Sequence, residues 1–238
     1  MKKSILISAA AIMMAAACQA QSKAVSGYLT IKGNLSDVKD TLVLVGSEYD
    51  NPRGAKITDL VTKNGKFEYK VKLDKPKNLL FYRPFSQQDK KSVMMSGSIP
   101  AIPGETVEIK GTVTDFQIKG TGFYKQFANL HNITKGIQQV YFAENEKYSA
   151  KTQDTKDENV KKEAAKAYQD AIKAAQEKLT ADLKTYLQAH KNEEASAYIA
   201  SYLDTKDLDL VMNTLDPSIV NGRLSGIFDA VKARIKAQ

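Results

Sequence analysis

The sequence predicts an α+β protein: an N-terminal antiparallel β-sandwich or partly closed barrel, followed by a C-terminal helical region with one long helix. Two observations predict this fold class. Short β-branched and aromatic runs, separated by turn residues, fill residues 22–125. Beyond them, in residues 126–238, the hydrophobic period changes from that of a strand to that of a helix. We therefore expect a β module over 22–125 and a helical module over 126–238.

Residues 1–20 have the pattern of an export signal. Lys2 and Lys3 precede an uninterrupted apolar run from Ile5 to Ala17, and small residues follow it. As a helix this run would span about 20 Å, which is shorter than the roughly 30 Å hydrocarbon core of a bilayer. It has no polar face, which argues against the alternative interpretation, a buried N-terminal helix. We expect the chain to be exported.

Two processing routes stay open. Ala15-Ala16-Ala17-Cys18 resembles the lipobox of bacterial lipoproteins, in which the cysteine is diacylated, although the usual leucine is replaced by Ala15. The alternative is cleavage after Ala20, which would give a soluble periplasmic protein. No acidic residue directly follows Cys18, so the first route predicts a periplasm-facing lipoprotein held by its acyl chains.

Cys18 is the sole cysteine of the sequence, and both routes remove its thiol by acylation or by cleavage. The mature chain is therefore expected to lack thiolate catalysis, disulfide exchange and cysteine-ligated metal.

The positive charge is concentrated in the β module. Without Lys2 and Lys3 the chain has 33 basic and 27 acidic residues, and residues 22–125 account for 17 and 11 of them. Such an excess suits phosphate or an acidic polysaccharide, or serves only to keep the surface solvated. We expect no nucleic-acid partner, because an exported protein meets little nucleic acid.

Eight short runs in the first half predict strands. Alternation is clearest over Lys66–Leu73, where apolar and charged residues take turns. Asn64-Gly65 stands just before this run and predicts a hairpin turn, because both residues tolerate positive φ. The expected strands are Gly27–Leu35, Thr41–Ser47, Lys56–Thr62, Lys66–Leu73, Asn78–Pro84, Lys91–Ser98, Thr106–Gly111 and Asp115–Gly120.

The second half predicts helices. An apolar stripe from Val160 to Tyr186 advances 26 residues in seven steps, about 3.7 per step, and predicts one long helix ending near His190. The preceding segment, 124–149, also has a helical pattern. Shorter helices are expected over Glu193–Leu203, Lys206–Leu215 and Pro217–Lys236, the last capped by Asp216.

Recognisable catalytic and cofactor motifs are missing from the sequence. His131 and His190 stand without the partners of a zinc site, and no nucleophile-elbow, P-loop or dinucleotide-binding motif occurs. We therefore expect no cofactor, no metal and no enzymatic activity. One cluster favours a ligand: Tyr82 and Arg83 at a strand end could stack on and bind an anion beside Lys90 and Lys91. The competing interpretation places Phe81 and Phe85 in the core and Tyr82 and Arg83 on a polar face.

The order of these segments resembles a known family. The motifs NGKFEY (64–69), Pro103-Gly104-Glu105 before a strand, and Gly120-Thr121-Gly122 before an aromatic helix start resemble the N-terminal domain of unknown function of Bacteroidota thioredoxin-like (TlpA/ResA-type) envelope proteins. The helical segment resembles the connector to the thioredoxin domain in that family. The resemblance implies an envelope location, but these 238 residues hold no C-x-x-C motif, so no catalytic residue carries over.

These expectations combine into a non-catalytic, envelope-anchored binding or interaction module with a membrane anchor at Cys18 and an envelope protein as its partner. Two alternatives remain: a structural or stress-related lipoprotein, and an envelope enzyme that uses carboxylates.

Overall fold

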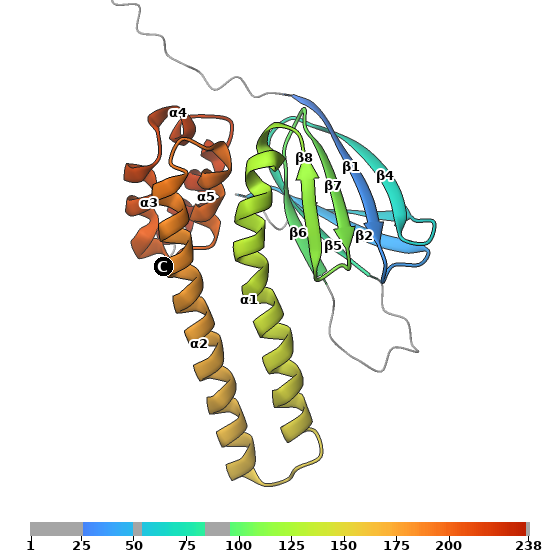
Figure 1. The fold of residues 1–238 in the computed structure, drawn as a ribbon, viewed down its shortest axis with the longest axis vertical. Helices are drawn as coiled ribbons and strands as arrows, with labels where there is room; N and C mark the ends of the chain where they lie inside the picture. Colours follow the sequence, from blue (N-terminus) through green and yellow to red (C-terminus); the bar gives the residue numbers. More distant parts are fainter. Residues whose placement is uncertain (1–25, 50–53, 84–95, 237–238) are drawn as a thin grey trace, which may run out of the picture.

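The computed structural model describes residues 26–49, 54–83 and 96–236 and shows two four-stranded sheets followed by a helical region (Figure 1). The α+β class is therefore confirmed. Sheet A has the strand order β4-β1-β7-β8, and sheet B has the order β3-β2-β5-β6. The strands are β1 (Gly27–Leu35), β2 (Thr41–Ser47), β3 (Lys56–Val61), β4 (Lys66–Leu73), β5 (Lys77–Tyr82), β6 (Ser96–Ala101), β7 (Thr106–Gly111) and β8 (Phe116–Gly120).

Most strand bounds agree with the sequence pattern, and β6 differs. The expected strand Lys91–Ser98 lies partly outside the described residues, and the strand that is described runs over Ser96–Ala101. Pro100 is in this strand although it has no N–H to donate. Because β6 is an edge strand of sheet B, a proline there can stand where no partner needs its N–H.

The expectation of a purely antiparallel module was wrong at one pair of strands. β1 and β7 pair in parallel, with Ile31 opposite Val107 and Gly33 opposite Ile109. A parallel pair needs a long crossover, and the chain supplies it by building all of sheet B between β1 and β7.

Asn64 and Gly65 form the tight turn that their sequence predicts, with φ of 51° and 75°. The turn does not close a hairpin ladder, however. β3 pairs with β2 in sheet B and β4 pairs with β1 in sheet A, and a single bridge joins Lys63 to Lys66. The turn therefore carries the chain from one sheet to the other.

The two sheets pack face to face through one apolar core. The rings of Phe81 in β5 and Phe116 in β8 lie 5.1 Å apart across it. Gly97 makes this approach possible, because a Cβ there would lie 2.6 Å from Phe81 and 2.7 Å from Phe116. The same core continues into the helical region through Phe123, Phe127 and other buried residues.

The helical region has two long helices, which corrects the expectation of one. α1 (Gly122–Thr152) and α2 (Glu158–Ala189) form a hairpin that extends past the end of the β module (Figure 1). The buried residues of α1 all lie in its first half, from Phe123 to Thr134. In its outer half, α1 contacts α2 through tyrosines. The ring of Tyr148 in α1 lies 5.8 Å from that of Tyr168 in α2, and Gln176 of α2 donates a hydrogen bond to the Tyr141 hydroxyl of α1. The helical pattern expected over residues 124–149 is thus one continuous helix with close to those bounds, and its outer half has few apolar contacts.

The C-terminal segment folds into short helices against the base of the hairpin. These are η2 (Glu194–Ser201), η3 (Thr205–Asp207), α3 (Leu208–Thr214), α4 (Pro217–Val220) and α5 (Ser225–Lys236). The helix expected over Glu193–Leu203 is a 3₁₀ helix, and the one expected over Pro217–Lys236 is two helices. Asp216 caps α4 by accepting from Ser218 N–H at 2.8 Å, as the sequence predicts.

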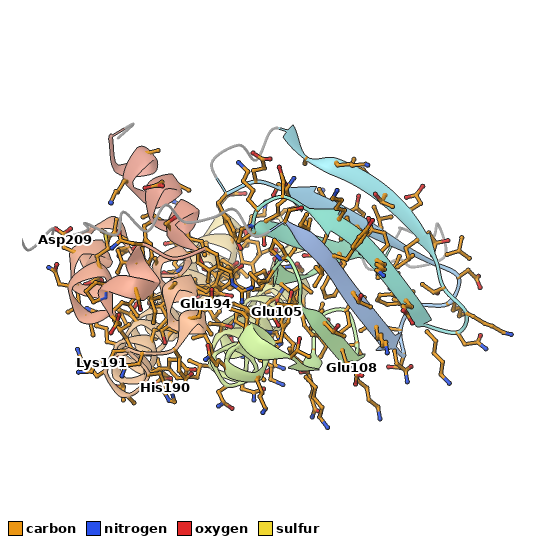
Figure 2. All side chains as sticks on the ribbon, turned by 90° about the horizontal axis from the view of Figure 1, so that it is seen from above. Glu105, Glu108, His190, Lys191, Glu194 and Asp209 are labelled. Atoms are coloured by element: carbon orange, nitrogen blue, oxygen red, sulfur yellow. The ribbon has the colours of Figure 1, made fainter. Side chains whose placement is uncertain are left out.

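The carboxylate of Glu105 connects the β module to the start of α1 and to the C-terminal short helices. Glu105 stands in the turn before β7, and its oxygens accept from Phe123 N–H and from the Thr121 hydroxyl at the start of α1. Arg223 donates to the same carboxylate at 2.7 Å and to Glu194 of η2. Figure 2 shows Glu105 and Glu194 close together where the two modules meet.

Candidate ligand cavity at the sheet–helix junction

A cavity of about 370 Å³ lies where sheet B meets the C-terminal helices. We call it the junction cavity. Three regions of the chain line it: the ends of strands in sheet B, the 3₁₀ helix η2 with the residue after it, and α5. Its lining residues are Ser47, Glu48, Tyr49, Asn78, Ser98, Tyr198, Ser201, Tyr202, Ile227, Ala230 and Val231. Polar groups therefore come from sheet B and η2, and α5 supplies an apolar wall.

Two buried polar atoms of this lining have no hydrogen-bond partner. They are the hydroxyl oxygen of Tyr49 and Oδ1 of Asn78, and within the described part of the chain no other buried side-chain oxygen or nitrogen is in this state. A buried polar group without a partner costs about 1–3 kcal/mol. Tyr49 can donate and accept, whereas Asn78 Oδ1 only accepts. Tyr49 and Asn78 both line the junction cavity, and the Tyr49 hydroxyl also interacts with that of Tyr198.

A chain of aromatic contacts builds one side of the cavity. The ring of Tyr198 lies edge-on to Tyr49 at 6.3 Å, to Tyr202 at 5.5 Å and to Phe127 of α1 at 5.3 Å. Burial raises the pKa of the hydroxyls of Tyr49, Tyr198 and Tyr202 above the usual value for tyrosine. These hydroxyls are therefore neutral at physiological pH and act as hydrogen-bonding groups, not as phenolates.

The charge at the rim of the cavity is paired. Glu48 accepts from Lys75 at 2.8 Å and lies 3.5 Å from Lys77. The hydrogen bond from Lys75 lowers the pKa of Glu48, so this carboxyl is ionised at neutral pH. Among the described lining residues, Glu48 is the one carboxylate, and none is a lysine, arginine or histidine. The cavity therefore suits a neutral polar molecule better than an anion.

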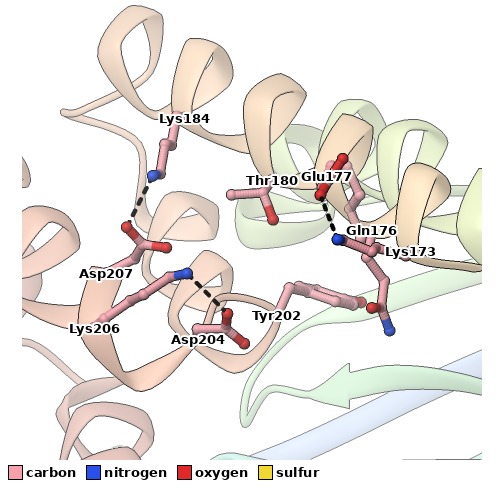
Figure 3. Close-up of a pocket in the computed structure, with 10 residues that line it drawn as sticks. Lys173, Gln176, Glu177, Thr180, Lys184, Tyr202, Asp204, Lys206 and Asp207 are labelled. Atoms are coloured by element: carbon pink, nitrogen blue, oxygen red, sulfur yellow. Dashed lines mark ion pairs between the residues drawn. The ribbon is translucent and has the colours of Figure 1, made fainter.

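Two further cavities have linings less suited to holding a small polar ligand. A groove of about 450 Å³ lies between α2 and the segment Tyr202–Asp207 (Figure 3). Its charged groups pair with one another, including Lys184 with Asp207 at 2.8 Å and Lys206 with Asp204 at 3.6 Å. A cavity of about 240 Å³ opens between the two sheets beside Leu44 and Leu79, which are part of the core.

The two histidines make structural contacts. His131 is buried in α1, stacks on Phe116 at 4.6 Å and forms a 3.0 Å hydrogen bond through Nε2 with the Phe116 carbonyl. His190 ends α2, where it stacks on Tyr186 and contacts Glu193 through Nδ1 at 3.0 Å. Within the described ranges, no three His, Cys, Asp or Glu residues are placed to hold a metal ion.

The anion site expected from the sequence is only partly described. Tyr82 ends β5 and is half-buried, and Arg83 donates to the Asp37 carbonyl at 3.3 Å. Lys90 and Lys91 lie outside the described residues, as does Cys18, the predicted lipidation site. The grouping of Tyr82, Arg83, Lys90 and Lys91 thus stays a prediction.

Sequence reasoning missed the junction cavity. Tyr49 and Asn78 come from two strand ends, and Tyr198 and Tyr202 come from a segment far along the chain. One signal was available: Tyr198 and Tyr202 are aromatic residues four apart in a segment otherwise rich in Ala and Ser. That spacing marks a packed face, but it does not show what the face meets.

Among the described helices, none is both long enough and apolar enough to span a bilayer. No family model and no curated protein matches the chain.

Some solved structures are similar over part of the chain. Wild-type pneumolysin matches with 13% identity and a TM-score of 0.24, over 40% of this chain and 23% of that one. Listeriolysin O matches with 11% identity and a TM-score of 0.23, over 40% and 22%. A disulfide-locked mutant of intermedilysin with human CD59 matches with 12% identity and a TM-score of 0.23, over 40% and 24%. The matched part of this chain spans about a quarter of the length of those structures.

Proposed function

We propose that the protein is a non-catalytic binding module of the cell envelope and that it holds a small, neutral, polar ligand in the junction cavity. One observation carries the proposal. Tyr49 and Asn78 line the same cavity, and each has a buried oxygen (Oη and Oδ1) that makes no hydrogen bond in the described structure. A ligand hydroxyl or amide that hydrogen-bonds to both atoms would remove two desolvation penalties at once.

The aromatic lining supports the same ligand class. Small polar molecules with apolar edges pack against tyrosine rings while their polar groups reach hydroxyls and amides. Tyr198 and Tyr202 supply the rings, and Ser98 and Ser201 supply additional hydroxyls. The described lining residues include no cation, which favours a neutral ligand over a phosphate or a carboxylate.

The carboxylates support a binding role over a catalytic one. Glu105 and Glu194 both pair with Arg223, and neither is among the described residues that line the junction cavity. Burial alone would raise the pKa of Glu105, yet hydrogen bonds from Arg223, Thr121 and Phe123 lower it. A carboxyl held ionised in this way is a poor general acid.

The envelope location rests on the sequence. The export signal and Cys18 support a periplasm-facing lipoprotein, and the resemblance to the N-terminal region of thioredoxin-like envelope proteins agrees with it. The two open sheets that face each other support an open β-sandwich as the architecture of the β module. In this proposal a second envelope protein receives or delivers the ligand.

A thermal-shift screen of small neutral polyols, sugars, nucleosides and amides tests the cavity. We expect at least one compound to raise the melting temperature of the wild type and to have no effect on the Tyr49→Phe, Asn78→Leu double variant. Tyr141→Phe is a matched control, since it removes a tyrosine hydroxyl from the distant part of the helix hairpin. A compound that stabilises the wild type and the double variant equally contradicts the proposed site. If no compound raises the melting temperature, the proposed ligand class is contradicted and the alternative, a structural lipoprotein without a small ligand, is favoured.

A further inference from the structure

The outer face of sheet A gathers most of the excess positive charge of the chain. In all four strands the apolar residues point to the core, and alternate residues on the other side are exposed. The exposed charged residues of this face are Lys32, Lys66, Glu68, Lys70, Lys72, Glu108, Lys110 and Lys119. Six lysines and two glutamates give a net charge of +4, whereas residues 22–238 as a whole have +6. In Figure 2 Glu108 lies on this side of the sheet.

The strand register arranges these charges in rows. Across the middle of the face, Glu68 in β4 is opposite Lys32 in β1, Lys32 is opposite Glu108 in β7, and Glu108 is opposite Lys119 in β8. Charges alternate along this row, so it is neutral as a whole.

The excess charge stands on both sides of the neutral row. Lys66 and Lys110 lie toward one end of the face, and Lys70 and Lys72 lie toward the other. Within the described part of the chain, none of the six lysines forms an ion pair.

An exposed tyrosine marks one end of the face. Tyr28 is 54% exposed, stands opposite Lys72 in the register, and has the Lys70 ammonium 4.9 Å from its ring centroid. Tyrosine beside lysine is the combination found where proteins meet the headgroup region of a bilayer, because the ring tolerates both apolar and wet surroundings.

The covalent chain places this end near the anchor. Gly27, the first residue of β1, follows Cys18 by nine positions, with eight residues between them. Even a fully extended segment of that length spans only about 30 Å. If Cys18 is acylated, as the proposed function holds, the end of sheet A with Tyr28, Lys70 and Lys72 cannot be farther than this from the bilayer surface.

We propose that the outer face of sheet A docks on an anionic phospholipid surface, with Tyr28 at the headgroups and the lysines next to the lipid phosphates. Each lysine near such a surface contributes about a fivefold gain in affinity. The acyl anchor holds the protein at the membrane, and the face sets its orientation. Sheet B and the junction cavity then lie on the side of the β module away from the bilayer.

Vesicle co-sedimentation tests this surface without the lipid anchor. The chain of residues 22–238 holds every described element, so it is mixed with vesicles of 30% phosphatidylglycerol in phosphatidylcholine and with pure phosphatidylcholine vesicles. We expect binding to the anionic vesicles alone, and we expect it to weaken as salt rises from 50 to 300 mM because the attraction is screened.

A charge-matched pair of variants locates the binding surface. Lys32→Gln, Lys72→Gln, Lys110→Gln removes three charges from the face, and we expect binding to fall about 100-fold. Lys156→Gln, Lys162→Gln, Lys191→Gln removes three exposed charges from the helical region, and we expect a loss below fivefold. Tyr28→Ser is expected to weaken binding at every salt concentration.

Several outcomes would overturn the proposal. These are equal binding to both kinds of vesicle, no binding to either, equal losses in the two triple variants, or binding to an acidic polysaccharide with none to vesicles. The junction cavity is intact in all these variants, so ligand binding measured on them separates a failure of this surface from a failure of the proposed function.

Discussion

Arg223 and Glu105 form an ion pair of 2.7 Å that joins the C-terminal helices to the β module. The side chain of Glu105 is 9% exposed and that of Arg223 is 22% exposed, so water screens the pair only partly. Because Glu105 also accepts from Phe123 N–H, the same carboxylate fixes the start of α1. This contact therefore links the β module to the start of α1 and to the C-terminal helices, which form one wall of the junction cavity.

Replacing Arg223 is expected to destabilise the protein. Arg223→Ala leaves Glu105 with a buried, unpaired charge and removes the partner of Glu194, so we expect the free energy of unfolding to fall by about 3 kcal/mol. Urea denaturation measures it. Lys166→Ala is the control, because it breaks an exposed pair with Asp170 and should cost less than about 0.5 kcal/mol. A loss below 0.5 kcal/mol for Arg223→Ala would show that the contact does not hold the modules together.

Acid should weaken the same contact. The pKa of Glu105 is lower in the folded protein than in the unfolded chain, since its hydrogen bonds with Arg223, Thr121 and Phe123 outweigh the effect of burial. Its stabilising contribution is therefore complete above about pH 4.3, the usual pKa of glutamate, and is lost as pH falls through the folded-state value. The difference in unfolding free energy between wild type and Glu105→Gln should shrink from pH 6 to pH 3. A difference independent of pH would contradict this role.

Gly122 is held next to Glu105 in a conformation that other residues avoid. Its φ is +39°, and a Cβ at this position would lie 2.5 Å from Glu105 Oε1. Gly122→Ala is expected to cost about 2 kcal/mol of stability by displacing the carboxylate. Gly136→Ala, in the same helix, meets nothing within 4 Å and should stabilise the protein by about 0.5–1 kcal/mol. Thermal unfolding compares the two, and equal effects would be inconsistent with the contact.

Local patterns in the sequence predicted the strands and the long second helix well. Alternation over Lys66–Leu73 predicted β4, and the positive φ values of Asn64 and Gly65 agree with the predicted turn. These features depend on neighbouring residues, so a single sequence contains them.

Features set by distant parts of the chain could not be predicted in this way. Nothing local specifies that β7 returns beside β1 in parallel, because five other strands separate the two in the chain. The junction cavity is the same kind of feature. Asn78 is half-buried and polar, as many strand-end residues are, and only the packing of η2 and α5 against sheet B gives it an unpartnered oxygen.

Removing the Tyr49 hydroxyl is expected to stabilise the free protein and to weaken ligand binding. In the free protein this hydroxyl is buried without a well-formed hydrogen bond, since burial raises its pKa more than the interaction with the Tyr198 hydroxyl lowers it, so Tyr49→Phe is expected to raise the free energy of unfolding by about 1 kcal/mol. The same change should weaken any ligand of the junction cavity. Urea denaturation without ligand gives the first quantity. A loss of 1 kcal/mol or more would mean that the hydroxyl has a structural partner.

Cys18 is expected to determine how the protein is held in the envelope. Cys18→Ala should move the protein from the membrane fraction to the soluble periplasmic fraction, because it removes the acylated side chain. Fractionation with immunodetection measures this, and intact mass of the wild type should show the added acyl chains. An unmodified wild-type mass that begins at Gln21 would instead support cleavage after Ala20.

Native mass spectrometry of the protein isolated from envelope extract tests the central claim most directly. We predict that the wild type retains a small, neutral molecule and that the Tyr49→Phe, Asn78→Leu double variant, folded to the same extent, does not. The same bound molecule at equal occupancy in both proteins, or no bound molecule in the wild type, would contradict a ligand site between sheet B and the C-terminal helices.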